Sequence, residues 1–292
     1  MMRATCALLV IVGCSNAPMM PGDTGDDGGK ADDGDASTDA GVEPDPDGDV
    51  DGNTGRPTIW QPPPGTSWQW QLTGTINTSF DVDMYDIDLF DAPTSKIAEL
   101  HAAGRIVICY FSAGSYENWR PDANQFPASA LGNNLDGWPG ERWLDTRSTA
   151  VRNIMKARLD LAAQRGCDGV EPDNIDGYTN GSGFALTAAT QINYNRFLAT
   201  EAHARNLSIG LKNDLDQVTQ LVGDFDWALN EQCFEYDECE LLEPFINAGK
   251  AVFEVEYGGQ TLANSICPTA NSMNFDTLVK RLDLDATRIS CR

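Results

Sequence analysis

Short apolar runs alternate with longer amphipathic stretches from Trp68 to the C-terminus of the chain. The runs have the length of buried β-strands, whereas the stretches repeat their apolar residues with a helical period of about 3.6. This alternation is typical of β–α units built around a parallel sheet. We predict eight strands, at Trp68–Leu72, Asp83–Leu89, Ile106–Phe111, Gly169–Pro172, Ser208–Lys212, Trp227–Asn230, Ala251–Val255 and Thr287–Ser290.

The amphipathic stretches between these runs predict the helices. Several of them end at a glycine, as is common at the C-terminal caps of helices. Eight strands in about 230 residues match the size of a (β/α)8 TIM barrel, which is the fold we predict for residues 57–292. The alternative is an open doubly wound sheet, but no glycine-rich phosphate loop follows the first run. The helices are expected at Ser95–Ala103, Thr149–Arg165, Thr187–Ala204, Leu215–Val222 and Leu241–Ala248.

The beginning of the chain follows another pattern. A short basic start at Met1–Arg3 precedes the apolar run Ala4–Val12, which at roughly nine residues is too short to span a bilayer. Such a start is typical of a signal peptide, and the Gly13-Cys14 junction resembles a bacterial lipobox. We therefore expect residues 1–13 to be removed and Cys14 to be lipidated, with a generic secretory signal as the alternative.

Residues 15–56 hold twelve acidic residues against Lys30 and Arg56, and they contain almost no large apolar side chains. A segment of this composition cannot bury enough surface to offset its ordering entropy. We expect residues 14–56 to form a disordered tether that begins at the lipidated cysteine. The protein is then exported and anchored to the bacterial outer membrane or cell surface through its lipid alone, or secreted if Cys14 is not modified.

The net charge of the chain is −24, and more than half of it remains on residues 57–292. A surface this acidic excludes nucleic acid as a ligand, because phosphates require a basic surface. It suits a cationic or neutral partner instead. We expect the protein to be a monomer.

Six cysteines follow the tether. An even number in an exported protein is typical of disulfides. Cys233 and Cys239 are spaced for a local loop, and Cys267 with Cys291 could fix the C-terminus, while the full connectivity stays open. Two histidines and no CxxC pair disfavour zinc, so we expect no metal and no organic cofactor. The six are Cys109, Cys167, Cys233, Cys239, Cys267 and Cys291.

Polar and aromatic residues gather where the predicted strands end, which is the catalytic face of a (β/α)8 barrel. Cleavage of a glycosidic bond needs two carboxyl groups, and acids on the fourth and sixth strands supply a pair across this rim. The strand ends read Cys-Tyr-Phe-Ser-Ala-Gly-Ser (109–115), Asp-Gly-Val-Glu-Pro-Asp-Asn-Ile-Asp (168–176), Leu-Lys-Asn-Asp (211–214) and Asn-Glu-Gln-Cys (230–233).

These four blocks, in this order, resemble glycoside hydrolase family 114, whose members are endo-α-1,4-polygalactosaminidases on a (β/α)8 barrel. The resemblance covers about residues 58–292. It implies that Asp173 and Glu231 are the catalytic acids, and we assign Asp173 as nucleophile and Glu231 as general acid/base. It also implies a galactosamine-rich polysaccharide as substrate, whose free amines suit the acidic protein.

Other rim residues are candidates for contact with the polysaccharide, since carboxylates can pair with amines and aromatic faces can stack on sugar rings. Asp86 and Asp88 are further acids of this kind, and an ion pair is the alternative role for Lys212. The alternative functions are hydrolysis of another α-linked, N-acetylated polymer, and polysaccharide binding without turnover, which would not need both acids. The substrate-binding candidates are Tyr110, Trp119, Glu171, Asn174, Tyr178, Lys212, Asp214, Asn230, Glu256 and Tyr257.

Overall fold

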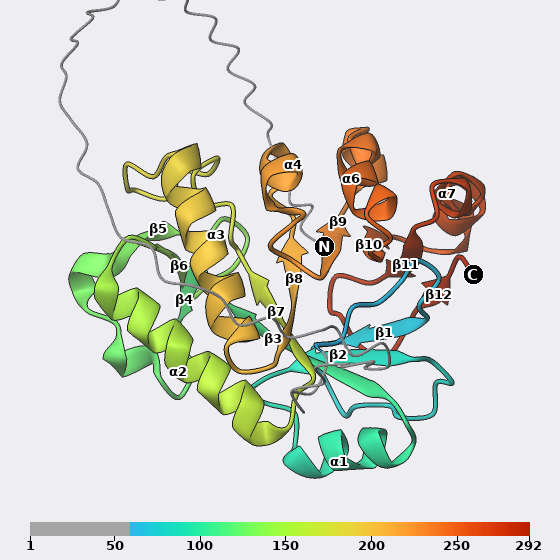
Figure 1. Ribbon diagram of the computed structural model, residues 1–292, viewed down its shortest axis with the longest axis horizontal. Helices are drawn as coiled ribbons and strands as arrows, with labels where there is room; N and C mark the ends of the chain where they lie inside the picture. The colour runs from blue at the N-terminus through green and yellow to red at the C-terminus, as the bar shows by residue number, and fades with distance from the viewer. Residues whose placement is uncertain (1–58) are drawn as a thin grey trace, which may run out of the picture. The chain divides into compact units, whose positions relative to one another are not determined.

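The structure, a computed structural model, describes residues 59–292; the predicted signal peptide, Cys14 and the tether lie outside the described residues. A curled sheet forms its centre and helices cover the outside of the sheet (Figure 1). All neighbouring strands are parallel except the last pair. In sheet order the strands are β1 (Trp68–Gln71), β2 (Met84–Asp88), β3 (Ile106–Ser112), β7 (Gly169–Asp173), β8 (Ser208–Lys212), β9 (Trp227–Glu231), β10 (Val252–Tyr257), β11 (Asp276–Lys280) and β12 (Ile289–Ser290).

The helices lie between successive parallel strands, as the alternating pattern predicts. Helix α2 buries Val151, Met155 and Leu159 against the sheet, and it ends at Gly166, whose φ of 86° is favourable only for glycine. No helix in residues 59–292 combines the length and apolar composition needed to cross a bilayer. The helices are α1 (Thr94–Ala102), α2 (Thr149–Arg165), α3 (Ala188–His203), α4 (Val218–Leu221), α5 (Cys233–Tyr236), α6 (Glu243–Asn247) and α7 (Gln260–Ser272), with 3-10 turns at Ala123–Gln125, Ala128–Ala130, Leu215–Gln217 and Cys239–Leu242.

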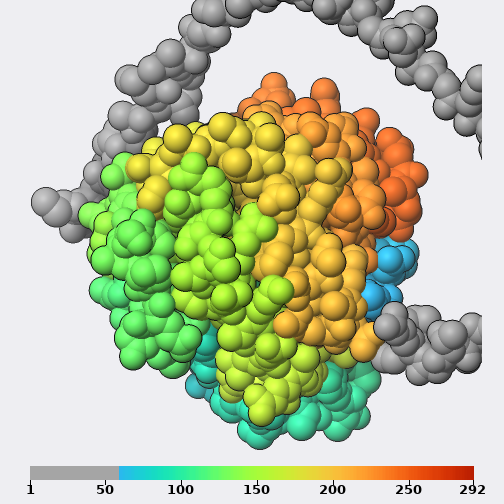
Figure 2. Space-filling model, turned by 60° about the vertical axis from the view of Figure 1, so that its left-hand side comes forward, coloured from blue at the N-terminus to red at the C-terminus, as the bar shows by residue number. Residues whose placement is uncertain are grey.

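A small antiparallel sheet is inserted between β3 and α2, in a region for which we predicted no strands. Its strands are β4 (Ser115–Glu117), β6 (Glu141–Leu144) and β5 (Leu131–Asn134), in that order. The insertion lies beside α2 and α3 in Figure 1 and forms the green flank of the molecule in Figure 2. It is attached closely to the main sheet, because Leu144 N donates to Gly114 O (2.9 Å) and Gly114 has no room for a side chain against the Asn174 carbonyl.

The alternation of side chains along each strand creates two apolar layers. One layer lies between the sheet and its helices. The other fills the inside of the curl and is rich in tryptophan, so the centre of the fold is a packed core and not a pore. Its buried members are Trp68, Trp70, Met84, Ile108, Trp227, Leu229, Ala251, Phe253, Val255 and Leu278.

The predicted α/β fold with a parallel sheet is confirmed, but the last strand was placed wrongly. The eighth parallel strand is β11, and the segment predicted as a strand at Thr287–Ser290 contributes only the short antiparallel β12. Side chains bridge the seam between β1 and β11, where no backbone ladder forms. Trp68 Nε1 donates to Asp276 O (2.7 Å) and Lys280 Nζ donates to Trp70 O (2.5 Å).

Three disulfides are present, as the even number of cysteines predicts. The pairs Cys233–Cys239 and Cys267–Cys291 agree with the spacing in the sequence, and the remaining pair is Cys109–Cys167. The pair Cys109–Cys167 joins β3 to the residue two positions before β7. Strands β3 and β7 are neighbours in the sheet.

Candidate active site

Lys212 lies at the centre of a group of carboxylates at the C-terminal ends of the strands. It is the last residue of β8 and is 1% exposed. Its ammonium Nζ lies 2.5 Å from Glu171 Oε1, 3.4 Å from Asp173 Oδ1 and 3.2 Å from Glu231 Oε2. Burial by itself lowers the pKa of a lysine, but the three carboxylates more than offset this and raise the pKa of Lys212 well above its usual value. The side chain is therefore a fixed cation.

The two predicted catalytic acids face each other across this ammonium. Their side chains are 19% and 23% exposed, so both reach solvent at the rim. Because one nitrogen atom contacts both, the nearest oxygens of Asp173 and Glu231 are no more than about 7 Å apart, which is below the upper limit of roughly 10 Å for the paired carboxyl groups of glycosidases. The structure thus brings together two residues that are far apart in the sequence.

Hydrogen bonds fix the orientation of the Asp173 carboxylate. Tyr110 Oη donates to Asp173 Oδ2 (3.0 Å), and Asn174 N donates to Asp173 Oδ1 (2.8 Å). The second contact depends on the left-handed backbone of Asn174, whose φ is 61°, a conformation that asparagine tolerates better than most residues. The Asn174 side chain donates to Ser112 Oγ (2.9 Å) and so ties the turn to the end of β3.

Glu231 is held by the two neighbouring strands. On one side, the Tyr257 hydroxyl of β10 donates to Glu231 Oε1. On the other, Asn213 Oδ1 accepts from Glu231 N (3.0 Å) and from Asn230 Nδ2 (3.2 Å). Asn213 and the following residue, Asp214, both have a φ of 51°, which turns the chain sharply after Lys212 and points the Asn213 amide at β9.

A second pair of acids lies below the site, inside the curl. Glu171 is completely buried and accepts from Trp70 Nε1 (2.9 Å) as well as from Lys212. Asp86, also completely buried, has no donor for either oxygen. Burial, together with the neighbouring Glu171 charge, raises the pKa of Asp86 well above its usual value. The raised pKa favours the neutral form of Asp86, and the Lys212 ammonium pairs with the neighbouring Glu171 carboxylate.

The other candidates are distributed between the rim and the interior. Tyr110, Asn174, Tyr178 and Tyr257 are half-buried at the rim, and Trp119 is 51% exposed on the inserted sheet. The remaining five are buried and contact other protein groups and not solvent, so they can act on a substrate only through other residues. They are Glu171, Lys212, Asp214, Asn230 and Glu256.

Two of these buried acids have clear structural partners. Glu256 Oε1 accepts from Phe234 N (2.8 Å) at the start of α5, and Asp214 Oδ2 accepts from Asn195 Nδ2 (2.8 Å) of α3. Burial and the nearby Asp176 raise the pKa of Asp214 to about 8. Asp88, a further candidate for binding amines, pairs with the buried Arg120 (2.7 Å). Sequence patterns do not reveal such partners.

The site also includes residues that the sequence did not single out. Asn213 orients Glu231, and Trp70 packs its ring 4.8 Å from Lys212 Nζ. Ser112, Ser115 and Glu141 form a chain of hydrogen bonds behind Asn174. Of these, only Asn213 and the two serines lie in the motif blocks. Their position in those blocks was the one sequence feature that could have identified them as site residues.

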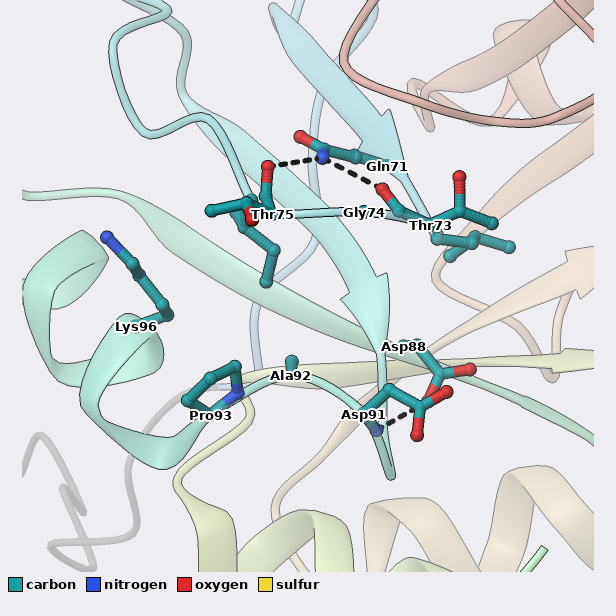
Figure 3. A pocket seen from close by; sticks show the side chains of 11 residues that line it. Gln71, Thr73, Gly74, Thr75, Asp88, Asp91, Ala92, Pro93 and Lys96 are labelled. Atoms are coloured by element: carbon teal, nitrogen blue, oxygen red, sulfur yellow. Dashed lines mark hydrogen bonds between the residues drawn. The ribbon is translucent and has the colours of Figure 1, made fainter. Parts of the chain in front are cut away.

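A cavity of about 420 Å³ lies between the loop after β1, the end of β2 and the start of α1 (Figure 3). Gln71 Nε2 shapes it by donating to Thr73 O (3.0 Å) and Thr75 O (2.9 Å). The cavity contains neither Asp173 nor Glu231. Since the charged groups needed for chemistry gather around Lys212, we place the active site there and not in this cavity.

Comparison with known proteins identifies the family of the chain. Residues 51–292 match the model of glycoside-hydrolase family GH114. The crystal structure of Aspergillus fumigatus Ega3 in complex with galactosamine is similar to the chain, with 48% sequence identity and a TM-score of 0.78; the match covers 81% of this chain and 99% of that chain. The search of curated proteins gave no match.

The glycoside hydrolase domain of PelA from Pseudomonas aeruginosa is also similar, with a TM-score of 0.62 at 12% identity over 78% of this chain and 99% of that chain. At this identity the likeness shows the fold alone. The family model covers most of the chain, however, and Ega3 supports the same family at much higher identity. The chain therefore belongs to glycoside-hydrolase family GH114 and is a glycoside hydrolase.

Proposed function

We propose that the protein is an endo-acting hydrolase of α-1,4-linked, galactosamine-containing polysaccharide, with Asp173 as nucleophile and Glu231 as general acid/base. The observation that carries the proposal is the position of the two carboxylates on either side of Lys212 Nζ, at 3.4 and 3.2 Å. Both also reach solvent, whereas the acids below them are buried. Binding alone would not require two acids in this arrangement.

In the proposed reaction, Glu231 donates a proton to the leaving glycosidic oxygen while Asp173 attacks the anomeric carbon. The bond to the leaving sugar breaks and an ester bond to Asp173 forms. Glu231 then takes a proton from water, which attacks the same carbon and releases Asp173. The upper limit of about 7 Å on the spacing is compatible with this double displacement, because retaining enzymes hold their carboxyl groups roughly 5 to 5.5 Å apart, whereas inverting enzymes need more room for water.

One difference in hydrogen bonding supports the division of roles. Each acid accepts from a tyrosine hydroxyl, but Asp173 also accepts from the backbone N–H of Asn174, and a further donor of this kind favours an ionised carboxylate. Lys212 is buried, so we assign it to positioning both acids and not to contact with the sugar. Glu171 anchors the ammonium from below, at 2.5 Å.

Galactosamine as the sugar unit rests on two observations. The chain carries a net charge of −24, which attracts a cationic polymer. Its relative Ega3, at 48% identity, has been crystallised with galactosamine. The alternative substrate is another α-linked polymer whose amines are acetylated. We further propose that the protein acts as a monomer without a cofactor, and that binding at the active site is restricted to polysaccharide.

Product analysis tests the substrate. The protein is incubated with partially de-acetylated and with fully acetylated α-1,4-polygalactosamine, and the products are sized by mass spectrometry over time. The proposal predicts mid-length fragments from the de-acetylated polymer that shorten later. Monomers released from the start would contradict endo action, and cleavage of the acetylated polymer alone would point to the alternative substrate.

We also propose that the protein is exported and anchored to the outer membrane or cell surface through lipid on Cys14, which lies outside the described residues. The basic start, the short apolar run and the Gly13-Cys14 junction support this. Palmitate labelling of the wild type and of Cys14→Ser decides between anchoring and secretion. An unlabelled wild-type protein in the medium would contradict the anchor and leave the catalytic proposal intact.

A further inference from the structure

Two tryptophans of the inserted antiparallel sheet are open to solvent. Trp119 is 51% exposed and Trp138 is 53% exposed, and they are among the few large apolar side chains exposed in residues 59–292. Single exposed apolar residues need no explanation. Two exposed indoles associated with one turn of the chain are different, because both offer an aromatic face to solvent from the same small region of the insertion.

The turn that carries Trp138 is tightly built. Residues Trp138-Pro139-Gly140-Glu141 are closed by a hydrogen bond from Glu141 N to Trp138 O (3.1 Å), and Gly140 has a φ of 98°. Proline followed by glycine at the two central positions is the signature of a type II turn. Proline fixes one backbone angle and glycine adopts the other at little cost, so the turn gives the backbone that carries Trp138 a defined conformation.

Trp119 rests on the same turn. Asn118 N donates to Gly140 O (3.2 Å). A Cβ atom at Gly140 would lie only 3.0 Å from Trp119 Cζ3, so the indole packs against the bare backbone of the glycine. We refer to Trp119 and Trp138, on their shared turn, as the aromatic platform.

The aromatic platform is linked to the catalytic site through hydrogen bonds. Glu141, the last residue of the turn, accepts from Ser115 Oγ (2.6 Å), and Ser115 Oγ lies 2.7 Å from Ser112 Oγ. Ser112 Oγ accepts from Asn174 Nδ2 (2.9 Å), next to the nucleophile Asp173. The platform thus has a defined position relative to the point of cleavage.

We propose that the aromatic platform binds sugar units of the polysaccharide that lie beyond those at the cleavage point, and that it recognises units carrying a free amine. This inference rests on the proposed function and extends it to a second contact with the same polymer. The face of an indole attracts a cation, and tryptophan does so best among aromatic side chains. The exposed Asp136, two residues before Trp138, adds negative charge beside the platform.

Charge complementarity selects this occupant over a protein partner. The chain is strongly acidic, and a polymer of amine-bearing sugars supplies positive charges at the regular spacing of its rings. Packing of the Trp119 indole against Gly140 also reduces the side-chain entropy that is lost on binding. Contact remote from the scissile bond lets a long chain bind more tightly than a short oligosaccharide does.

The test compares long polymer with short oligosaccharides. The variants are Trp119→Ala, Trp138→Ala and the double variant, with Trp60→Ala as the matched control. Trp60 is half-buried near the amino-terminal ends of β2 and β3, at the opposite end of the strands. For the double variant we expect KM for de-acetylated polymer to rise about tenfold, with kcat and the cleavage of short oligosaccharides unchanged. Trp60→Ala should leave KM unchanged, and melting temperatures identify any variant that folds poorly.

Binding measurements separate this inference from the proposed function. Polymer affinity is measured by calorimetry in the Glu231→Gln background, with and without the two alanine substitutions. If the polymer binds less tightly once the two tryptophans are replaced, the inference is supported, even if the wild type cleaves none of the polymers. Normal cleavage with KM unchanged within about twofold in the double variant overturns it. If the protein binds fully acetylated polymer as tightly as de-acetylated polymer, and the two alanine substitutions weaken both equally, the platform does not recognise amines.

Discussion

Lys212, the last residue of β8, contacts residues from three other strands, so four strands of the sheet meet at its side chain. Its ammonium contacts Glu171 and Asp173 of β7 and Glu231 of β9, and its face toward β1 is covered by Trp70. A charge buried to this degree is stable only when it is fully paired. Here the pairing also limits the distance between the two proposed catalytic acids, so a structural ion pair becomes part of the site.

Replacement of this lysine should change the pH dependence of the enzyme as well as its rate. For Lys212→Met we expect kcat/KM to fall by about 100-fold or more. The acidic limb of the pH–rate profile should also move to higher pH, because the carboxylates lose the cation that favours their ionised form. The measurement is kcat/KM on de-acetylated polymer across the pH range.

Lys280→Met is the matched control, since Lys280 is also buried but donates to the carbonyls of Trp70 and Asp285. This variant should lose stability at the seam between β1 and β11 and keep the wild-type pH profile. A fall in the activity of Lys212→Met with an unshifted acidic limb would show that the lysine serves the fold alone.

The sequence was sufficient to propose the two acids, because they lie at the ends of strands in short motifs that resemble those of the family. It was insufficient for the buried candidates. Whether an acid such as Glu256 faces a substrate or caps a helix depends on which segment packs over it, and α5 approaches from another part of the chain. Asn213 was overlooked because its role depends on a left-handed turn of the backbone, which the sequence does not reveal.

Among the elements, the disulfides tie the ends of strands and loops together. Cys109–Cys167 closes a segment with a sequence separation of 58, and Cys233–Cys239 closes one of 6. A cross-link that closes a longer segment removes more freedom from the unfolded chain. The first disulfide also spans the whole inserted sheet, so it limits how far the insertion and α2 can separate from β3 and β7.

Removing each pair of cysteines should therefore have unequal effects. By loop entropy, Cys109→Ala with Cys167→Ala should lower the free energy of unfolding by about 4 kcal/mol, and Cys233→Ala with Cys239→Ala by about 2 kcal/mol. Denaturant unfolding of the two double variants at one pH gives both values. A larger loss for the short segment would contradict the expectation that loop length decides the order.

The long periodic helices and most strands could be predicted, because their apolar spacing is regular. Helix α7 was missed, since Pro268 interrupts its pattern and Gly258 and Gly259 precede it. Strand β11 follows it directly and has charged residues at both ends, Asp276 and Lys280, which are buried against the seam. The strands of the insertion have three or four residues each, too few for a period to show.

The molecule as a whole buries several acids that are neutral or partly neutral. Burial is the main cause in each case, raising the pKa of Asp214 to about 8 and the pKa values of Glu141 and Asp276 to about 7. In the unfolded chain these groups have ordinary pKa values of about 4. The folded protein therefore holds protons that the unfolded chain releases, and stability must depend on pH.

The sign of this dependence follows from the raised values. The groups contribute their full stability below about pH 4 and lose it as the pH rises through the folded values of about 7 to 8. We expect the free energy of unfolding to fall between about pH 5 and pH 8.5. Asp214→Asn should make the fall shallower, because asparagine does not titrate and tolerates the left-handed backbone at this position. Denaturant unfolding at several pH values measures this, and stability that rises over the interval would contradict it.

The central claim, that Asp173 and Glu231 perform the cleavage, is tested most directly by the rates of Asp173→Asn and Glu231→Gln on de-acetylated polymer. Both substitutions keep the shape of the side chain and remove its ionisable group. We expect each to lower kcat by about 1,000-fold or more, with a melting temperature close to that of the wild type. A correctly folded variant that keeps more than about a tenth of the wild-type rate would show that its residue is not one of the two catalytic acids.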